Sequence, residues 1–513
     1  MYKLFDISDE PRINGTQELY FRKNGDKVSF DTYFNSIPVR KLRKYTEISR
    51  IIFSQEAEIC TEKGMIKKGS SITVADIPDD AEMLYIRTAQ CGGRIAVFAE
   101  GKHRDIRPVI IICTYHREQQ VKANIDHLLR QESDIGIILV DNASSIPVDS
   151  WKNSRITVLH NINNGGSGGF ACGMRYAAEQ KRFTHMILMD DDVVIDFTAV
   201  SKMTGFLSFM KDEYADISIS GSMIYADRPT IQFECGGFFS KDGTQTGHGY
   251  NFDLTDRQQL ILNEADNHIN YGGWWFMCMP LKYAEKGEFP APFFLKYDDV
   301  EYALRCRLDI ITLNGVGIWH ENFGNKYNSV QEYFNTRNYL FLMKKHSPGF
   351  TTKKAYKAAR YLLLEKLCRQ QYKMAEAVLL GYEDFLKGEK YLDEIDYCVK
   401  LSQLRKLNYR YLSEEESAER YGIAFDEKLY TECGSRPFRR YMQPLLYGHL
   451  VPGFLCRRLT ITDVISDRKE HYFRAKNTLH FNTVHRQGYV TQRSLSSFLR
   501  CIFRIRKIYK GCC

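Results

Sequence analysis

The sequence is short of the features that mark secreted, membrane-spanning and disulfide-linked proteins. Only 13 of its 513 residues are proline, which argues against long disordered linkers. No stretch approaches the roughly 18 consecutive apolar residues of a membrane-spanning helix. The polar start MYKLFDISDEPRING predicts no secretory signal, and the 14 cysteines form neither a CxxC pair nor a zinc-spaced cluster. We therefore expect a cytoplasmic protein with reduced thiols, either free or peripheral on the inner face of the cell membrane.

The charge balance is mildly basic. The formal net charge is +8, an excess that suits anionic ligands or an anionic membrane surface. It does not by itself indicate nucleic acid, and the sequence lacks the interleaved basic and stacking motifs of nucleic-acid-binding proteins. We expect no nucleic-acid partner. The length predicts two or three domains rather than one core.

The two ends of the chain have different patterns. Residues 1–105 contain short β-like runs separated by turn signals, such as KVSFDTYF (27–34) and RIAVFAEG (94–101). This spacing predicts an N-terminal β-sandwich or barrel. Residues 346–513 are charge-rich and helical in pattern, which predicts a C-terminal helical domain.

The central region, residues 106–345, has an α/β pattern. Apolar strands such as VIIICTY (109–115) and IGIILVDN (135–142) alternate with helical stretches. This alternation predicts a parallel sheet covered on both faces, in which ligands collect at the carboxyl ends of the strands. Polar clusters follow four of the predicted strands: Thr114–Arg117, Asp141–Asn142, Asn161–Asn164 and Asp190–Asp192.

Three adjacent carboxylates follow the strand HMILM, and like charges in a row need a positive partner. Because side chains alternate along an extended strand, Asp190 and Asp192 point together while Asp191 points away. Paired carboxylates suit a hard divalent ion, Mg²⁺ or Mn²⁺, which commonly bridges protein to substrate phosphates. His320, after another predicted strand, could add a nitrogen ligand; the alternative is a structural histidine. For the acidic run, the alternative is a solvated turn.

A glycine-rich segment, NNGGSGGF (163–170), separates a predicted strand from a helix. It matches neither the Walker nor the dinucleotide-binding spacing. The glycines permit positive φ and close approach, so we expect a ligand or another chain segment to pass nearby. A flexible loop is the alternative.

Two further motifs suggest carbohydrate chemistry. Trp274 and Trp275 are adjacent in a chain with only four tryptophans, and indole rings stack on sugar faces. The alternative is a pair of core residues. Asp298 and Asp299 open a predicted helix, where one carboxylate would suffice as a cap and the other could act as a general base.

Taken together, these blocks resemble the family 2 glycosyltransferases of the GT-A fold, and in particular the galactofuranosyltransferases that polymerise galactan from UDP-galactofuranose. The resemblance covers about residues 30–345, and its blocks stand in the family's order. They are TYFNSIP (32–38), TYHR (114–117), NNGGSGGFACGM (163–174), MDDD (189–192), FECGG (233–237), GGWWFMCMP (272–280), FFLKYDD (293–299), GVGIWHE (315–321) and YFNTRN (333–338).

The resemblance implies a Rossmann-like mixed sheet and a role for each matched position. Its metal ligands for Mn²⁺ or Mg²⁺ fall on Asp190, Asp192 and His320, and its catalytic base falls on Asp299. Its donor-binding positions fall on Thr114, Tyr115, Arg117, Asp141, Asn163 and Asp191. Its acceptor- and sugar-binding positions fall on Glu234, Trp274, Trp275 and Asp298.

The implied activity is inverting, metal-dependent transfer of galactofuranose to a galactan or other cell-surface glycan, with a lipid-linked acceptor expected. Two alternatives stay open. One keeps the fold with another nucleotide sugar, as in a rhamnosyl- or glucosyltransferase. The other is a non-catalytic glycan-binding protein, against which the joint presence of the MDDD motif, Asp299 and His320 argues.

The C-terminal tail, residues 494–513, has apolar residues at helical spacing interleaved with arginine and lysine. Such a basic amphipathic helix is typical of a membrane-surface anchor. A terminal helix packed on the protein body is the equal alternative. The sequence leaves open whether the chain forms a homo-oligomer.

Overall fold

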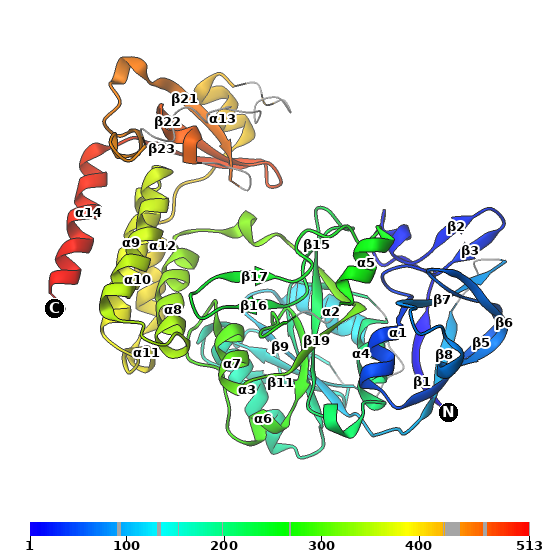
Figure 1. Cartoon of the computed structure of the whole chain (residues 1–513). Coiled ribbons are helices and arrows are strands. Elements are labelled where there is room, and N and C mark those ends of the chain that lie inside the picture. Colours follow the sequence, from blue (N-terminus) through cyan, green and yellow to red (C-terminus); the bar gives the residue numbers. More distant parts are fainter. Residues whose placement is uncertain are drawn as a thin grey trace. The chain divides into compact units, whose positions relative to one another are not determined.

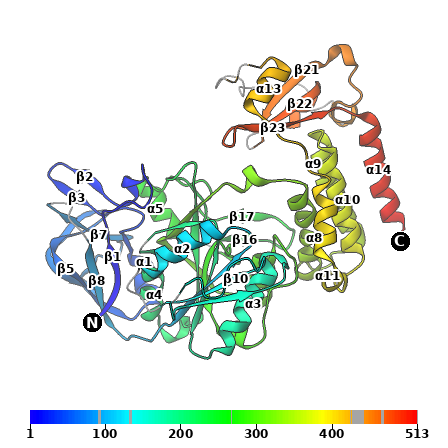
Figure 2. The same cartoon turned by 180° about the vertical axis from the view of Figure 1, so that it is seen from behind.

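A computed structural model describes residues 1–89, 94–130, 135–151, 153–196, 198–265, 268–423, 425, 442–464 and 469–511. The chain divides into two compact units (Figures 1 and 2). Unit 1 comprises Met1–Phe294 and Asp298–Glu321, and unit 2 comprises Leu295–Tyr297 and Asn322–Cys513. The division into three domains at residues 105 and 345 stays a prediction.

The N-terminal part of unit 1 is an eight-stranded antiparallel sheet, which confirms the predicted sheet-rich domain. Its order is β1-β8-β5-β7-β3-β2, with β4 beside β7 and β6 beside β5. The long strand β5 pairs with β8 near its start and with β7 near its end, as strands do when they serve two faces of a sandwich. The strands are β1 (Tyr2–Ile7), β2 (Arg22–Asn24), β3 (Lys27–Ser29), β4 (Ile37–Pro38), β5 (Ile48–Thr61), β6 (Gly64–Thr73), β7 (Met83–Thr88) and β8 (Ile95–Gly101).

The central sheet of unit 1 has the order β11-β10-β9-β12-β18-β14-β19-β13. The first four strands are parallel, as the apolar alternation predicts, but β18 is antiparallel to both of its neighbours. The sheet is therefore mixed, which confirms the Rossmann-like mixed sheet that the family resemblance implies and corrects the purely parallel sheet expected from the apolar runs. Its strands are β9 (Pro108–Thr114), β10 (Gly136–Asp141), β11 (Ile156–His160), β12 (His185–Asp190), β13 (Val194–Ile195), β14 (Ser218–Tyr225), β18 (Phe276–Pro280) and β19 (Ile310–His320), with β15 (Gln232–Glu234) beside β14.

Helices α2 (Glu118–Leu129), α3 (Gly165–Glu179), α4 (Ala199–Ser208), α5 (Arg257–Asn263), α6 (Lys282–Glu285) and α7 (Asp298–Cys306) accompany this sheet. The glycine-rich segment forms the start of α3. Gly165 has φ +71°, and a Cβ there would lie 2.0 Å from the carbonyl oxygen of Phe294. A Cβ at Gly169 would lie 2.1 Å from the Cys113 sulfur. The glycines thus admit two protein segments, which fits the expectation of a close approach.

The N-terminal sheet and the central sheet share buried contacts within unit 1. The Tyr20 hydroxyl donates to Asp196 at 2.6 Å, and the buried Lys202 ammonium donates to the carbonyls of Phe34 and Ser36 at 3.0 and 2.8 Å. The ring of Phe34 also lies 5.5 Å from that of Trp319 on β19. The two sheets are therefore joined by one continuous core.

Unit 2 contains the helices that the sequence predicts. They are α8 (Ser329–His346), α9 (Thr352–Cys368), α10 (Tyr372–Leu386), α11 (Tyr391–Glu394), α12 (Tyr397–Arg405), α13 (Glu414–Tyr421) and α14 (Leu495–Lys510). Among the described helices of both units, none is long and apolar enough to cross a membrane.

Unit 2 also contains a four-stranded sheet, ordered β20-β23-β22-β21, that the sequence analysis did not predict. Several of its buried positions are polar, among them Thr460 and Thr462 of β21 and Thr478 and His480 of β22, so the buried face does not show as an apolar pattern in the sequence. The strands are β20 (Leu412–Ser413), β21 (Arg457–Asp463), β22 (Ala475–Asn482) and β23 (Gln487–Gln492).

Candidate active site

The carboxyl ends of the parallel strands bring the predicted polar clusters to one edge of the central sheet. In the strand register Thr114 is opposite Asp141, and Asp190 is opposite Cys113. His320 ends β19. Ligands bind at this edge in open α/β sheets.

Asp190, Asp192 and His320 form a cluster whose ligand atoms all lie within 4.8 Å of one another. His320 Nε2 is 3.1 Å from Asp192 Oδ1, and its Nδ1 lies 2.5 Å from the Glu321 carbonyl oxygen. Donation from Nδ1 to that carbonyl would leave Nε2 with the lone pair that a metal ion needs. Burial raises the pKa of Asp190 to about 7. Two carboxylates and one neutral imidazole fit a divalent metal ion.

Asp191 lies outside the metal cluster, as predicted, but it does so because β12 ends at Asp190 and Asp191 and Asp192 lie in the following turn, not because side chains alternate along a strand. Its carboxylate accepts from the Thr114 hydroxyl and from Arg117 Nη1, both at 2.7 Å. Arg117 Nη1 also lies 2.9 Å from Asp192 Oδ2. Asn124 donates to the Asp191 carbonyl at 3.0 Å. Arg117 is therefore one positive partner of the acidic run, a contact that the sequence analysis did not predict.

The other predicted donor-binding residues lie near this edge in different environments. The buried Asp141 carboxylate accepts from the backbone N–H groups of Ala143, Ser145 and Ile146 at 2.6–2.9 Å, and so closes the turn after β10. The Asn163 side chain accepts from Gly165 N at 3.1 Å. In contrast, the Tyr115 ring is exposed at the end of β9.

A second group of carboxyls surrounds Glu234 at the end of β15. Burial, and then the charge of Asp299, raises the pKa of Glu234 to about 8. The same two causes raise the pKa of Asp298 to about 8. Asp298 and Asp299 both lie in the first turn of α7, where Asp299 Oδ1 accepts from Val300 N at 2.8 Å. Glu234 and Asp298 thus favour their protonated forms near neutral pH.

The surroundings of Glu234 include residues that the sequence analysis missed. The Tyr271 hydroxyl lies 3.4 Å from Glu234 Oε1 and accepts from Gln245 Nε2 at 2.8 Å. A Cβ at Gly247 would lie 2.2 Å from Glu234 Oε2. Tyrosine, glutamine and glycine occur throughout the chain, so no local pattern marks these three.

Trp274 and Trp275 are both buried, with 5% and 7% of their surface exposed. The Trp274 ring packs edge-on against Phe170 and Tyr302. Trp275 Nε1 donates to the Gly221 carbonyl at 3.0 Å. These contacts fit the core-pair alternative, and a sugar contact for either ring stays a prediction.

Comparison with known proteins points to the same family that the sequence motifs resemble. Residues 109–275 match the model of glycosyl transferase family 2. The chain is a glycosyltransferase. Its central domain has the GT-A fold, with a mixed sheet and an acidic motif at the end of β12. The divalent-metal cluster and a nucleotide-sugar donor accord with this family.

Two curated relatives are galactofuranosyltransferases. The chain is 23% identical to galactofuranosyltransferase GlfT2 of Mycolicibacterium smegmatis, over 75% of this chain and 68% of that protein. It is 26% identical to galactofuranosyltransferase GlfT2 of Mycobacterium tuberculosis, over 47% of this chain and 40% of that protein.

Solved structures are more distantly similar. A mannosyltransferase from Pyrobaculum calidifontis, in complex with GDP-Man and Mn²⁺, is 13% identical and matches 59% of this chain and 85% of its own, with a TM-score of 0.33. Residues 1–349 of S. aureus TarS, in complex with UDP-GlcNAc, are 11% identical and match 63% of this chain and 93% of that chain, with a TM-score of 0.35.

Proposed function

We propose that this chain transfers galactofuranose from UDP-galactofuranose to a hydroxyl of a galactan or other cell-surface glycan, with inversion at the anomeric carbon. The observation that carries the proposal is the convergence of Asp190, Asp192 and His320 at the sheet edge. The similarity to two galactofuranosyltransferases supports the choice of sugar.

On the donor side, Asp190, Asp192 and His320 would hold Mn²⁺ or Mg²⁺, which would neutralise the diphosphate and stabilise UDP as the leaving group. Arg117 offsets the charges of Asp191 and Asp192 and so keeps the acidic run compact. The exposed Tyr115 ring offers an aromatic face to the uracil. Thr114, Asp141 and Asn163 shape the strand ends against which the nucleoside lies.

On the acceptor side, Asp299 takes the proton of the acceptor hydroxyl while the hydroxyl oxygen forms a bond to the anomeric carbon of the donor sugar. The bond from that carbon to the UDP oxygen breaks with its electron pair leaving on UDP. A single displacement inverts the configuration and needs no second carboxylate nucleophile. Glu234 and Asp298, whose pKa values are raised to about 8, stay protonated and donate hydrogen bonds to sugar hydroxyls. Trp274 and Trp275 shape the wall of the sugar site.

A donor panel tests the proposal. The protein is incubated with Mn²⁺ or Mg²⁺, synthetic galactoside-lipid acceptors, and UDP-galactofuranose, UDP-galactopyranose, UDP-glucose or dTDP-rhamnose. We expect galactofuranosylated products, with the linkage inverted relative to the donor. Transfer from UDP-glucose or dTDP-rhamnose alone would favour the other-sugar alternative. Absence of metal-dependent UDP binding would favour a non-catalytic glycan-binding protein.

We also propose that a basic face of unit 2 docks on an anionic membrane that carries a lipid-linked acceptor. Helix α14 lies against α10, where its Arg504 pairs with Glu383 at 3.0 Å, and its Phe498 and Ile505 are buried. This packing is what the terminal-helix alternative predicts for the inner face. The Tyr509 ring stacks on Tyr356 of α9 at 4.4 Å, which makes α9 and α14 neighbours.

The outward residues of these two helices are basic and aromatic. Phe503 on α14 is 61% exposed and Tyr361 on α9 is 63% exposed. Helix α14 contains no acidic residue. Anionic lipid attracts such a face, and exposed rings insert at the headgroup level. The exposed basic residues are Lys353, Lys354, Lys357 and Arg360 of α9 and Arg500, Arg506, Lys507 and Lys510 of α14.

Vesicle flotation tests the docking proposal. We expect flotation with phosphatidylglycerol-containing vesicles at low salt, little with phosphatidylcholine alone, and loss on Arg500→Glu/Lys507→Glu. The matched control is Lys67→Glu/Lys68→Glu on β6 of unit 1. Equal flotation of wild type and the α14 variant would contradict a role for this face.

A further inference from the structure

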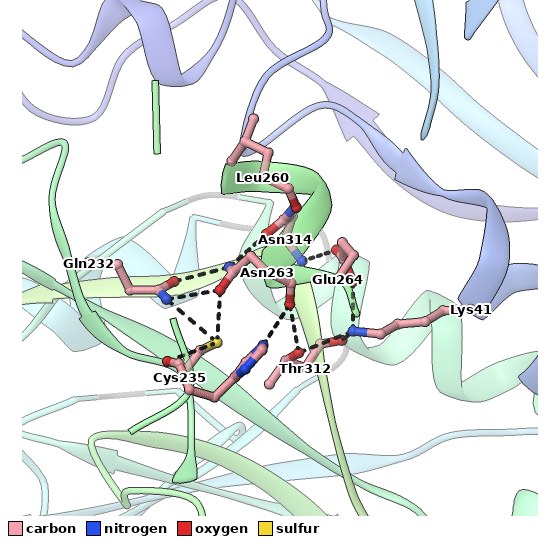
Figure 3. Close-up of polar contacts among 9 residues, drawn as sticks. Lys41, Gln232, Cys235, Leu260, Asn263, Glu264, Thr312 and Asn314 are labelled. Atoms are coloured by element: carbon pink, nitrogen blue, oxygen red, sulfur yellow. Dashed lines mark hydrogen bonds and ion pairs between the residues drawn. The ribbon is translucent and has the colours of Figure 1, made fainter. Parts of the chain in front are cut away.

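A buried polar network connects the N-terminal sheet domain to the strand that carries Glu234 (Figure 3). It begins at Lys41 on α1 (Val39–Tyr45), whose side chain is only 1% exposed. Lys41 Nζ lies 2.7 Å from Glu264 Oε2 and 3.1 Å from Thr312 Oγ1 on β19. A lysine from the N-terminal domain is therefore paired inside the central domain, next to the end of α5.

Asn263 is the hub of the network. Its Nδ2 donates to Gln232 Oε1 at 3.1 Å and to Asn314 Oδ1 at 2.9 Å. Its Oδ1 accepts from Gln232 Nε2 at 2.9 Å and from the Cys235 thiol at 3.3 Å. Figure 3 shows these side chains converging from β15, α5 and β19. A side-chain amide with both ends bonded in this way has one orientation only.

The contacts of Asn263 bracket Glu234 in the sequence. Gln232 precedes Glu234 by two residues, and Cys235 follows it directly. The opposite wall of Glu234 is tied to the same hub, because the Asn263 carbonyl lies 2.9 Å from His248 Nε2 and Gly247 lies against the Glu234 carboxyl. The Cys235 N–H in turn donates to the His248 carbonyl at 3.0 Å. The segments on both sides of the carboxyl are thus fixed by one residue.

Glu264 joins the two halves of the network. It follows Asn263 directly, accepts from the Asn314 backbone N–H through Oε1, and pairs with Lys41 through Oε2. Removing Lys41 alone would leave a buried carboxylate without this cation, which is costly in a low-dielectric interior. The end of α5 would then shift to reach water, and Asn263 would move with it.

We infer that Lys41 is a positioning residue for transfer: through Glu264 and Asn263 it fixes the Gln232–Cys235 segment, and with it the Glu234 carboxyl. The N-terminal sheet domain is then part of the acceptor site rather than an independent module. This inference rests on the acceptor-side role of Glu234 proposed above. It predicts a defect in acceptor use, with donor and metal binding spared, because none of the network residues lies in the Asp190–His320 cluster.

The test uses the full chain with the double variant Lys41→Met/Glu264→Gln, which removes both charges together and so leaves no unpaired ion. We expect the acceptor KM to rise or kcat to fall about tenfold, with UDP affinity in Mn²⁺ within about twofold of wild type, since tenfold corresponds to the loss of one hydrogen bond of about 1.4 kcal/mol. The single variant Lys41→Arg keeps a cation beside Glu264, and its acceptor kinetics should therefore lie closer to those of the wild type than the kinetics of the double variant do.

The matched control is Lys211→Met. Lys211 also joins α1 to the central domain, by donating to the carbonyls of Arg43 and Lys44 at 3.0 and 2.7 Å, but it lies outside the network. We expect it to lower the unfolding midpoint without changing the acceptor kinetics. The inference would be overturned if the double variant had the same acceptor kinetics as the wild type. It would also be overturned if Lys211→Met showed the same kinetic defect as the double variant.

Combination with Glu234→Gln separates this inference from the proposed function. If Lys41 acts through Glu234, the triple variant should be no worse than Glu234→Gln alone, because effects on one chain of contacts do not add. Additive defects would overturn the positioning role and leave the galactosyl transfer intact. If the wild type transfers no galactofuranose, the proposed function fails, and the carbon-13 NMR titration of the Glu234 carboxyl still tests the positioning: it should differ between wild type and the double variant but not in Lys211→Met.

Discussion

Two clusters of carboxyl groups lie in the same unit and are built in opposite ways. In the acidic run at the end of β12, Asp191 and Asp192 contact the Arg117 guanidinium, and His320 Nε2 lies 3.1 Å from Asp192 Oδ1. Glu234 interacts with the neutral Tyr271 hydroxyl and with another carboxyl group, that of Asp299. The first cluster is arranged to attract positive charge, and the second is arranged to retain protons.

The difference teaches that environment, rather than residue type, assigns the chemistry. Burial raises the pKa of Asp190 as well, to about 7, but a metal ion bound by Asp190, Asp192 and His320 would displace that proton, whereas buried carboxyls beside a like charge keep a proton and can donate it. In a transferase these two jobs belong to the donor and the acceptor. Each of the following substitutions should therefore affect one side and leave the other unchanged.

The largest effect is expected for Asp192→Ala. This change removes one of the three groups of the metal cluster and one carboxylate paired with Arg117. We expect loss of metal-dependent UDP binding and a fall in transfer of at least about 10³-fold, since a bound ion contributes several kcal/mol to leaving-group stabilisation. Calorimetric titration with UDP and Mn²⁺ measures this, and the exposed Asp79→Ala is the control. UDP binding at wild-type affinity in the variant would place the metal site elsewhere.

Asp299→Asn should be nearly as damaging to transfer but silent in UDP binding. An amide cannot accept the proton of the acceptor hydroxyl, so we expect kcat to fall about 10²- to 10⁴-fold, the usual contribution of a general base. Single-turnover transfer and UDP titration on the same preparation separate the two quantities. If UDP binding vanished with transfer, Asp299 would belong to the donor cluster, and the comparison between the two clusters would break.

The sequence predicts the donor cluster far better than the acceptor cluster. Asp190 ends a recognisable apolar strand, and the structure groups it with Asp192 as predicted, although the turn after β12, rather than strand alternation, sets Asp191 apart. His320 could be named because it ends a predicted strand. The contact between Arg117 and the acidic run could not be predicted, because the two are 74 residues apart and meet only through the order of the strands.

The acceptor side is assembled by long-range contacts that leave no local pattern. Tyr271 reaches Glu234 across 37 residues, and Lys41 reaches Thr312 across 271. The residues of β18 did not reveal its antiparallel direction, because a buried apolar strand has the same pattern in either direction, and the mixed sheet was expected from the family resemblance alone. The burial of Trp274 and Trp275 likewise could not be predicted from these two residues, because it depends on how α3 and α7 pack around them.

Glu234→Gln should have a moderate effect on the acceptor side only. Glutamine keeps a hydrogen-bond donor but cannot ionise. The wild-type acceptor KM should therefore rise about tenfold as pH passes the Glu234 pKa of about 8, because the ionised group no longer donates and repels Asp299. The variant should show a smaller rise in acceptor KM from pH 6 to 9, because only Asp298, whose pKa is also raised to about 8, still titrates in this range. A rise of equal size in the variant would show that another group titrates.

The smallest effect is expected for the pH dependence of stability at the same residue. Because the pKa of Glu234 in the folded protein is raised from its ordinary value near 4.5 to about 8, the folded state binds the proton more tightly than the unfolded state does. The stability that this proton contributes is present at low pH and is lost as pH rises through 8. Between pH 6 and 9 the unfolding midpoint of the wild type should thus fall by a few degrees more than that of Glu234→Gln. The corresponding loss in the free energy of unfolding is at most about 1.4 kcal/mol for each pH unit below the folded-state pKa. Scanning calorimetry of both proteins measures the difference, with Asp242→Asn as a surface control that should track the wild type. If the two curves ran parallel, Glu234 would be ionised in the folded protein, and the acceptor cluster would resemble the donor cluster instead of opposing it.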